Sequence, residues 1–290
     1  MRKFYLVIIG IILFGSTSAR AHDLLVVQGL RVKPFDEAFR GFRNVCSADA
    51  RRIYLPDMDK ADLSHIVREE RPRLILAIGA DALARVRKVK GVSILYLMVL
   101  NPHLDTAGST NVSGVTMHVP PEKYFDHLTR ISPNPKTVGL VYDPAKTGHL
   151  VKRAHQAARS RGIELTAVEV RRANDVPKAL GSLKGMVDAL LMLPDTTVVT
   201  PETVEFFLLF SQNNGIPVIT FASKYVEMGA LLSLDIDAYD QGKQAGEMAL
   251  QILNGATASE LPVAEARKVH VKTNRSVARK LGITLGNLDR

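Results

Sequence analysis

The chain has 290 residues, of which 46% are hydrophobic and 23% charged, and its formal net charge is +9 at pH 7. This composition is typical of a globular protein and excludes an intrinsically disordered one, and the length suffices for two domains with cores of their own. The single cysteine, Cys46, excludes an internal disulfide and metal sites built on several cysteines.

The first 21 residues have the features of a secretory signal peptide. Arg2 and Lys3 precede an apolar run at residues 4–14, and Ala19 and Ala21 belong to an A-x-A cleavage site. A helix over that run would be about 16 Å long, which is well short of the roughly 30 Å hydrocarbon layer of a membrane. We therefore expect cleavage after Ala21 and a periplasmic location, with a retained membrane anchor as the alternative.

From residue 22 onward, short apolar strands alternate with amphipathic helices. In the first half we expect strands at residues 24–28, 52–55, 73–78, 92–98 and 113–116, and helices at 34–44, 60–70, 80–88 and 120–131. In the second half we expect strands at residues 137–142, 164–170, 189–193, 217–221 and 230–234, and helices at 147–161, 176–184 and 202–213, with a last helix that ends at Gly255. Strands that are rich in Val, Ile and Leu on both faces are typical of a parallel sheet covered by helices on each side.

These patterns predict the α/β class, with two doubly wound parallel-sheet lobes joined by three hinge crossings. The crossings are expected near His118, near Asp235 and at residues 256–262. The predicted domains are lobe 1 at residues 22–117 and 236–258, and lobe 2 at residues 118–235 and 262–290. Since no flexible linker separates the two sets of elements, the lobes should abut directly, and we expect the chain to be a monomer.

Motifs of catalysis, metal binding and nucleic-acid binding are missing from the sequence. None of the eight histidines forms an H-x-x-x-H or H-E-x-x-H pair, and there is neither a G-x-S-x-G elbow nor a P-loop. The basic residues are scattered, apart from short runs such as residues 85–90, and no helix-turn-helix precedes the α/β part. We therefore expect neither an enzyme nor a nucleic-acid-binding protein, and no metal or cofactor.

Four segments resemble the ABC-transporter substrate-binding protein family whose better-known members bind aromatic amino acids, a branch of the type 1 periplasmic binding proteins. The likeness covers residues 70–285, and its segments are residues 111–115 (NVSGV), 138–161, 229–255 and 271–285 (VKTNRSVARKLGITL). In the 229–255 segment, a strand, a polar break and a helix resemble the second crossing of that fold.

The resemblance implies that the chain captures a small solute, such as an amino acid or a related amine or carboxylate, in the cleft between its lobes. It further implies delivery of the unaltered solute to the membrane permease of an ABC transporter. The alternative is a periplasmic sensory module that signals to a membrane histidine kinase or chemoreceptor. Closure of two lobes about a hinge suits both functions.

Candidate ligand contacts lie at the carboxyl ends of the predicted strands, because open α/β sheets bind ligands there. The candidates that follow from the strand ends alone are Asn101, Tyr142, Asp143, Phe221, Ser223 and Asp235. Tyr142 and Phe221 could stack on an apolar ligand. Each candidate could instead be a turn or packing residue, and Asp235 could brace the hinge.

The family resemblance implies further candidates in three loops. They are Gly29 and Arg31 after the first strand, Gly79, Ala80 and Asp81 after the third, and Asp195 and Thr196 after the strand at 189–193. Asp195 keeps an acid that could pair with a ligand ammonium. The chain departs from the family pattern at Arg31, Ala80, Asp81, Thr196 and Lys224, so that a ligand other than an aromatic amino acid is an open alternative. Asp81 either caps its own helix or faces the cleft, where it would favour an amine.

Overall fold

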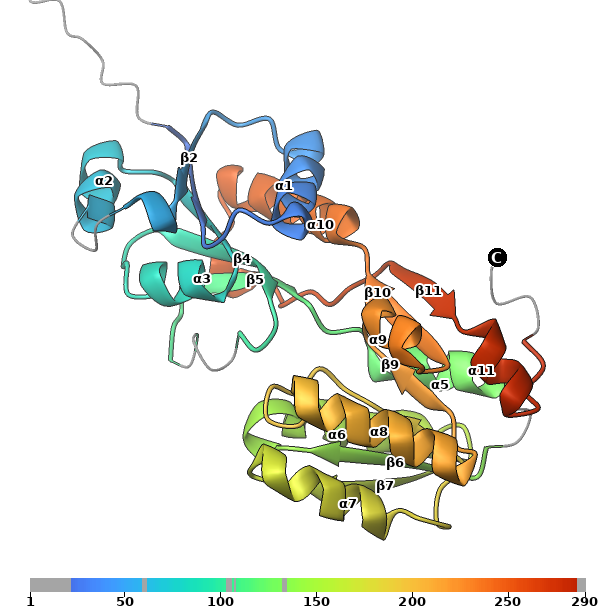
Figure 1. Ribbon diagram of the computed structural model, residues 1–290. Helices are drawn as coiled ribbons and strands as arrows, with labels where there is room; N and C mark the ends of the chain where they lie inside the picture. The colour runs from blue at the N-terminus through green and yellow to red at the C-terminus, as the bar shows by residue number, and fades with distance from the viewer. Residues whose placement is uncertain (1–21, 59–61, 103–105, 107, 132–134, 286–290) are drawn as a thin grey trace, which may run out of the picture.

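The structure is a computed structural model that describes residues 22–58, 62–102, 106, 108–131 and 135–285. The predicted signal peptide therefore lies outside the described residues. Figure 1 shows two α/β lobes, called lobe 1 and lobe 2 below, which are joined by more than one passage of the chain. Within the described residues, no helix is both long enough and apolar enough to cross a membrane.

Lobe 1 is built on a five-stranded sheet in which each strand is parallel to its neighbours, in the order β2-β1-β3-β4-β5. Its strands are β1 (Leu24–Gln28), β2 (Ala50–Tyr54), β3 (Leu74–Ile78), β4 (Ser93–Val99) and β5 (Val112–Thr116). Its helices are α1 (Lys33–Val45), α2 (Asp62–Glu70), α3 (Ala80–Val86) and, from much later in the chain, α10 (Ala238–Leu253).

Successive residues of the lobe 1 strands enter two cores, one on each face of the sheet. Leu74, Leu76 and Ile78 of β3 belong to the core beneath α1 and α10, whereas Ile75 and Ala77 belong to the core beneath α2 and α3. Burial on both faces explains why this strand is apolar at every position. The predicted doubly wound arrangement is therefore confirmed for lobe 1.

Lobe 2 is built on a six-stranded sheet in the order β11-β10-β9-β8-β6-β7, in which only the edge strand β11 is antiparallel to its neighbour. Its strands are β6 (Thr137–Tyr142), β7 (Glu164–Glu169), β8 (Ala189–Leu191), β9 (Val218–Thr220), β10 (Leu232–Ile236) and β11 (Val269–Thr273). Its helices are α5 (Pro121–Ile131), α6 (Pro144–Arg159), α7 (Val176–Ser182), α8 (Pro201–Asn214), α9 (Ser223–Met228) and α11 (Arg275–Lys280). Cores on both faces of this sheet confirm the same layered arrangement.

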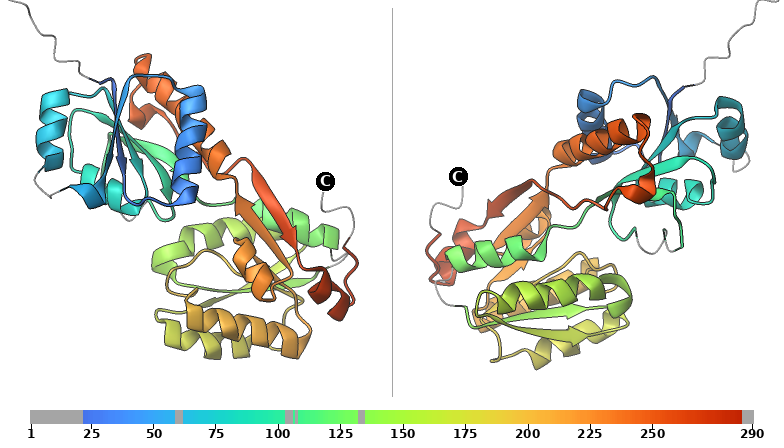
Figure 2. Two further views of the ribbon diagram at one scale, coloured as in Figure 1. Left: turned by 45° about the horizontal axis from the view of Figure 1, so that its top comes forward. Right: turned by 180° about the vertical axis from the view of Figure 1, so that it is seen from behind.

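Three passages of the chain connect the lobes. The first follows β5 at residues 117–120, and the second is Asp237, which joins β10 of lobe 2 to α10 on lobe 1. Figure 2 shows α10 beside α1 from two further directions. The third runs beside β5, where Ala264 forms a bridge to Val115, and reaches lobe 2 after that residue rather than at the predicted 256–262.

Most predicted elements are present, with bounds that agree to within about three residues. Helix α6 begins earlier than predicted, because the Asp143 side chain accepts a hydrogen bond from the Ala145 N–H at 3.0 Å and Pro144 is tolerated in the first turn. The structure adds α9, β11 and α11, which the sequence analysis did not predict.

Candidate functional site

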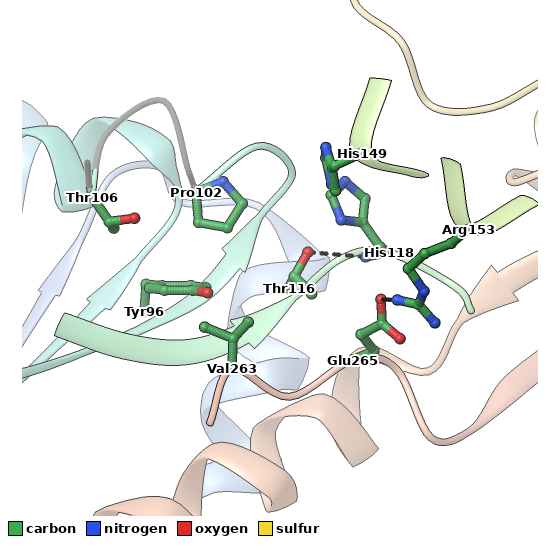
Figure 3. Close-up of a pocket in the computed structure, with 9 residues that line it drawn as sticks. All are labelled: Tyr96, Pro102, Thr106, Thr116, His118, His149, Arg153, Val263 and Glu265. Carbon is green, nitrogen blue, oxygen red and sulfur yellow. Dashed lines mark hydrogen bonds and ion pairs between the residues drawn. The ribbon is translucent and has the colours of Figure 1, made fainter. Parts of the chain in front are cut away.

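A cavity of ≈ 670 Å³ lies between the lobes, beside two of the chain passages (Figure 3). Its lining comprises Tyr96, Pro102, Thr106 and Thr116 from lobe 1, His149 and Arg153 from lobe 2, and His118, Val263 and Glu265 from the passages. Because both lobes contribute, a molecule held there would be in contact with each of them.

The lobe 1 side of the cavity is shaped by the contact between β4 and β5. An added Cβ on Gly114 would lie 2.2 Å from the Tyr96 carbonyl oxygen, so only glycine allows the two strands to approach this closely. Tyr96 is buried, and burial raises the pKa of its phenol. At the end of β5, the Thr116 carbonyl accepts a hydrogen bond of 2.8 Å from the Gln241 side chain, which ties α10 to this wall.

The lobe 2 side carries an ion pair and two imidazoles. Arg153 on α6 pairs with Glu265 and, at 3.3 Å, with Glu122 of α5. The hydrogen bond to Glu265 raises the pKa of Arg153 despite partial burial, and the charges of both glutamates add to this effect. The His118 and His149 rings lie 5.3 Å apart between centroids and are tilted by 53°.

The cavity therefore offers two kinds of surface to a ligand. Tyr96, Pro102 and Val263 are suited to an apolar group, whereas Arg153 and Glu265 present one positive and one negative charge side by side. A cavity of this volume with a mainly apolar lining and few polar groups is typical of small-molecule sites. A dipolar ligand with an apolar part matches it better than a simple anion or cation.

Among the predicted residues of lobe 2, two carboxylates hold the strand-end loops together. The buried Asp195 accepts hydrogen bonds from the Asp143 N–H (2.8 Å), the Thr147 hydroxyl (2.5 Å) and the backbone N–H groups of Thr197 (2.9 Å) and Val198 (3.1 Å). Asp143 accepts from the Thr197 hydroxyl at 2.7 Å. Partial burial raises the pKa of Asp143, but the Thr197 and Ala145 hydrogen bonds outweigh it, so that the net pKa lies below its ordinary value.

Asp235 plays a similar part at the end of β10. Its carboxylate accepts from the Ser223 N–H at 2.7 Å and from the Ser233 hydroxyl at 2.5 Å, which fixes the first turn of α9. Phe221 packs edge-on against Tyr225, with ring centroids 5.4 Å apart.

The last two predicted residues of lobe 2 lie at its rim. The Tyr142 hydroxyl donates to Glu169 at 2.9 Å. Burial is the main cause of the raised pKa of Tyr142, and this hydrogen bond raises the pKa further. Thr196 is exposed.

Two of the predicted residues of lobe 1, Gly29 and Asp81, line a separate cavity of ≈ 470 Å³. Asp81 lies in the first turn of α3, and the cap is Gly79, so the alternative that Asp81 caps its own helix is wrong. Gly79 has φ +94°, and an added Cβ would lie 2.6 Å from the Phe35 ring. Ala80 is exposed.

The remaining predicted residues of lobe 1 differ in their hydrogen bonding. Arg31 pairs with Asp57 and stacks 4.3 Å over the Tyr54 ring. The Oδ1 atom of Asn101 is buried and has no hydrogen-bond partner in the described part of the chain. A ligand N–H could supply the donor that this oxygen lacks.

None of the thirteen predicted residues lines the inter-lobe cavity, and sequence reasoning missed the residues that do. His118 was noted only as a crossing position, and His149 was weighed only as a metal ligand. Arg153 and Glu265 are far apart in the sequence and meet only because the third passage runs beside α6. No local pattern marks such a pair.

Comparisons with known proteins agree with this architecture. Residues 56–288 match the family described as ABC transporter substrate binding protein. The tyrosine-binding protein of Clostridioides difficile (strain R20291) is 25% identical over 218 residues, which cover 72% of this chain and 62% of the relative. The chain therefore spans less than two thirds of that curated relative.

Solved structures show the same two-lobe fold. The ligand-free, open structure of a substrate binding protein with adhesive properties from Clostridium difficile superposes with a TM-score of 0.72 at 24% identity, over 92% of this chain and 97% of that one. A domain from Streptococcus pneumoniae in complex with L-Trp has a TM-score of 0.61 at 21% identity, over 91% and 95%. The family match extends over more than half of the residues of this chain, which therefore belongs to the ABC transporter substrate binding protein family.

Proposed function

We propose that the protein captures an amino acid, or a related amine or carboxylate, between its lobes and delivers it unaltered to the permease of an ABC transporter. The observation that carries this proposal is the ≈ 670 Å³ cavity to which both lobes contribute. A ligand that contacts both lobes stabilises their closed arrangement, and a permease can recognise that arrangement.

The side-by-side charges of Arg153 and Glu265 support an amino acid as the ligand. In the described structure, neither the Arg153 Nε nor the Glu265 Oε2 atom has a hydrogen-bond partner, so each charge retains capacity for a further bond. A ligand carboxylate would extend the Arg153 contacts, and a ligand ammonium those of Glu265. The apolar lining would take the side chain. The relatives described as tyrosine-binding and as a complex with L-Trp are in keeping with such a ligand.

The predicted strand-end residues would then contribute once the lobes have closed around the ligand. Thr196 is exposed in one strand-end loop and the Asn101 Oδ1 atom lacks a partner among the described residues of another, so closure of the lobes would bring both toward a ligand. Asp143, whose carboxylate already accepts from Thr197 and Ala145, would position its loop. We further propose that the chain acts in the periplasm as a monomer, after removal of residues 1–21.

The absence of tryptophan from the sequence gives a direct test. Added L-tryptophan is the only indole in the sample, so its emission, excited at wavelengths that tyrosine does not absorb, reports its own binding. We expect a blue shift on binding, displacement by other amino acids, and a higher melting temperature with each ligand that binds. If amino acids, amines and small carboxylates all leave both the emission and the melting temperature unchanged, the proposal is wrong.

A further inference from the structure

A third cavity lies at the opposite edge of lobe 1, at the amino ends of β3 and β4. It measures ≈ 490 Å³, and the described residues of its lining include Arg68, Arg71 and Lys90 but no acidic residue. Arg68 comes from the last turn of α2, Arg71 from the turn into β3, and Lys90 from the turn into β4. Three cations from separate segments therefore surround one concave space.

These cations have no carboxylate partners in the described part of the chain, although acids lie nearby. Glu69 pairs with His65 at 3.1 Å, Glu70 pairs with Arg51, and Asp23 pairs with Arg73 at 3.6 Å. Glu70 and Asp23 are thus paired with other arginines, and Glu69 contacts a histidine, which carries a charge only when it is protonated. Arg68, Arg71 and Lys90 are exposed and line the cavity.

Favourable placement at a helix end explains only part of this cluster. Arg68 lies in the last turn of α2, where a cation stabilises the helix dipole by about 0.3–1 kcal/mol. Lys90 belongs to another segment and gains nothing from that helix. Both Arg71 (φ 43°) and Gly91 (φ 77°) adopt left-handed backbone conformations, so two tight turns bring the basic segments to the cavity.

The cavity is remote from the inter-lobe cavity. Ligands of open α/β sheets bind beyond the carboxyl ends of the strands, whereas this space lies at the amino ends. In all three ribbon views, α2 lies at the end of lobe 1 that is far from lobe 2 (Figures 1 and 2). Leu24 pairs with Leu74 at the same edge, so the chain enters the fold close to these cations.

We infer that this basic cavity binds a phosphate group. Arginine guanidinium groups match phosphate oxygens in geometry, three cations balance a phosphate charge, and no carboxylate belongs to the described lining of the cavity. The source is either free phosphate or the headgroup of an anionic phospholipid. A headgroup would hold lobe 1 at the membrane surface by the edge opposite the ligand cleft, which leaves the cleft free to open and close.

The test compares two full-length double variants with equal loss of charge. Arg68→Gln/Lys90→Gln changes the cavity, and Arg159→Gln/Lys184→Gln removes one arginine and one lysine from exposed sites of lobe 2. Binding of inorganic phosphate is measured by calorimetry. Co-sedimentation is measured with vesicles of phosphatidylcholine alone and of phosphatidylcholine with phosphatidylglycerol. Melting curves verify that both variants fold.

We expect the cavity variant to lose affinity by about fivefold for each cation removed, whereas the lobe 2 variant stays close to wild type. Raised salt should abolish binding, because the Debye length falls from about 8 Å at 0.15 M to about 3 Å at 1 M. Cavity-dependent binding of inorganic phosphate identifies the free anion as the ligand, and cavity-dependent binding only to phosphatidylglycerol vesicles identifies the headgroup. Equal losses in the two variants, or no binding to either probe, would overturn the inference.

Discussion

The two lobes share one architecture but hold their cleft-facing edges by different means. In lobe 2, buried or half-buried carboxylates tie the strand-end loops to one another: Asp195 accepts four hydrogen bonds from two segments, and Asp235 fixes the start of α9. In lobe 1, close backbone contacts do this work, as where Gly79 meets Phe35 and Gly114 meets Tyr96. Ion pairs act at the lobe 1 edge as well, where Arg31 contacts Asp57 and Arg52 contacts Asp36, so the edges differ in their buried carboxylates and not in whether polar side chains are present.

This difference bears on how each lobe could meet a ligand. A carboxylate whose oxygens are filled by protein donors positions the loops around it and has little capacity left for a ligand. The lobe 2 loops are therefore ordered before any ligand arrives. Lobe 1 combines close glycine contacts with exposed or half-buried ion pairs at its strand ends, so its contribution depends both on the shape of the main chain and on those side chains.

The largest effect, a loss of folding stability, is expected from Asp195→Ala. The substitution leaves the N–H groups of Asp143, Thr197 and Val198 without an acceptor, and we expect a loss of about 4 kcal/mol in the free energy of unfolding. Urea denaturation of the ligand-free protein measures it. The matched change in lobe 1 is Asp81→Ala, which removes an exposed acid from a first helical turn and should cost less than about 1 kcal/mol. Equal losses would remove the contrast between the lobes.

The second largest effect is a loss of stability in lobe 1, where the backbones of helices α1 and α10 are in direct contact. An added Cβ on Gly242 would lie 1.8 Å from the Ala38 carbonyl oxygen, so Gly242→Ala should destabilise the protein by about 3 kcal/mol. The control is Gly148→Ala in α6 of lobe 2, where the nearest atom would be 3.7 Å away and where alanine should stabilise the helix by about 0.5–1 kcal/mol. A neutral result for Gly242→Ala would show that α10 can move away from α1 at little cost.

The layered architecture could be predicted from the sequence because it rests on local periodicity. The β3 run LILAI is apolar at every position and indicates a strand buried on both faces. Strand β11 was missed because its sequence, VHVKT, is short and alternates half-buried with exposed residues, as an edge strand does. Helix α9 has six residues and owes its start to Asp235, which is twelve residues away in sequence.

The cleft between the lobes was expected from the family resemblance, but the residues that line it could not be predicted from local periodicity. Strand-end reasoning finds loops within each lobe, whereas Arg153 and Glu265 meet through the path of the third passage beside α6. This ion pair depends on how the lobes are placed relative to each other, and the hydrophobic periodicity of the sequence carries no information about that placement. The thirteen predicted residues therefore stay predictions about the closed state.

A smaller effect is expected when the ion pair of the cavity is changed. Arg153→Gln should weaken binding of an amino acid about thirtyfold but leave binding of the matching amine, which lacks the carboxylate, nearly unchanged. Glu265→Gln should show the converse selectivity toward the N-acetylated amino acid, which lacks the ammonium. Competition against bound L-tryptophan measures both. Arg159→Gln on the same helix is the control, and equal weakening of all three ligand types would show that the pair shapes the cavity without contacting the ligand.

The smallest expected effect is a pH dependence at the second passage between the lobes. Asp237 contacts Lys268 at 2.7 Å, His270 at 3.2 Å and the Asp240 N–H at 2.9 Å. Burial raises the pKa of Asp237, but the Lys268 hydrogen bond, together with the Asp240 N–H and the nearby positive charges, brings the net pKa below its ordinary value.

Because the folded-state pKa of Asp237 is lowered, its contribution to stability is present above the unfolded pKa of about 3.9 and disappears as the pH falls through the folded value. The melting temperature of the wild type should therefore fall by a few degrees more than that of Asp237→Asn on acidification below about pH 4. The variant should be less stable than the wild type at neutral pH and should approach it in acid. Parallel curves for the two proteins would mean that the Asp237 contacts are too solvent-exposed to stabilise this passage, and would place the hinge stability instead on the pairing of Arg267 with Asp240 and Glu247.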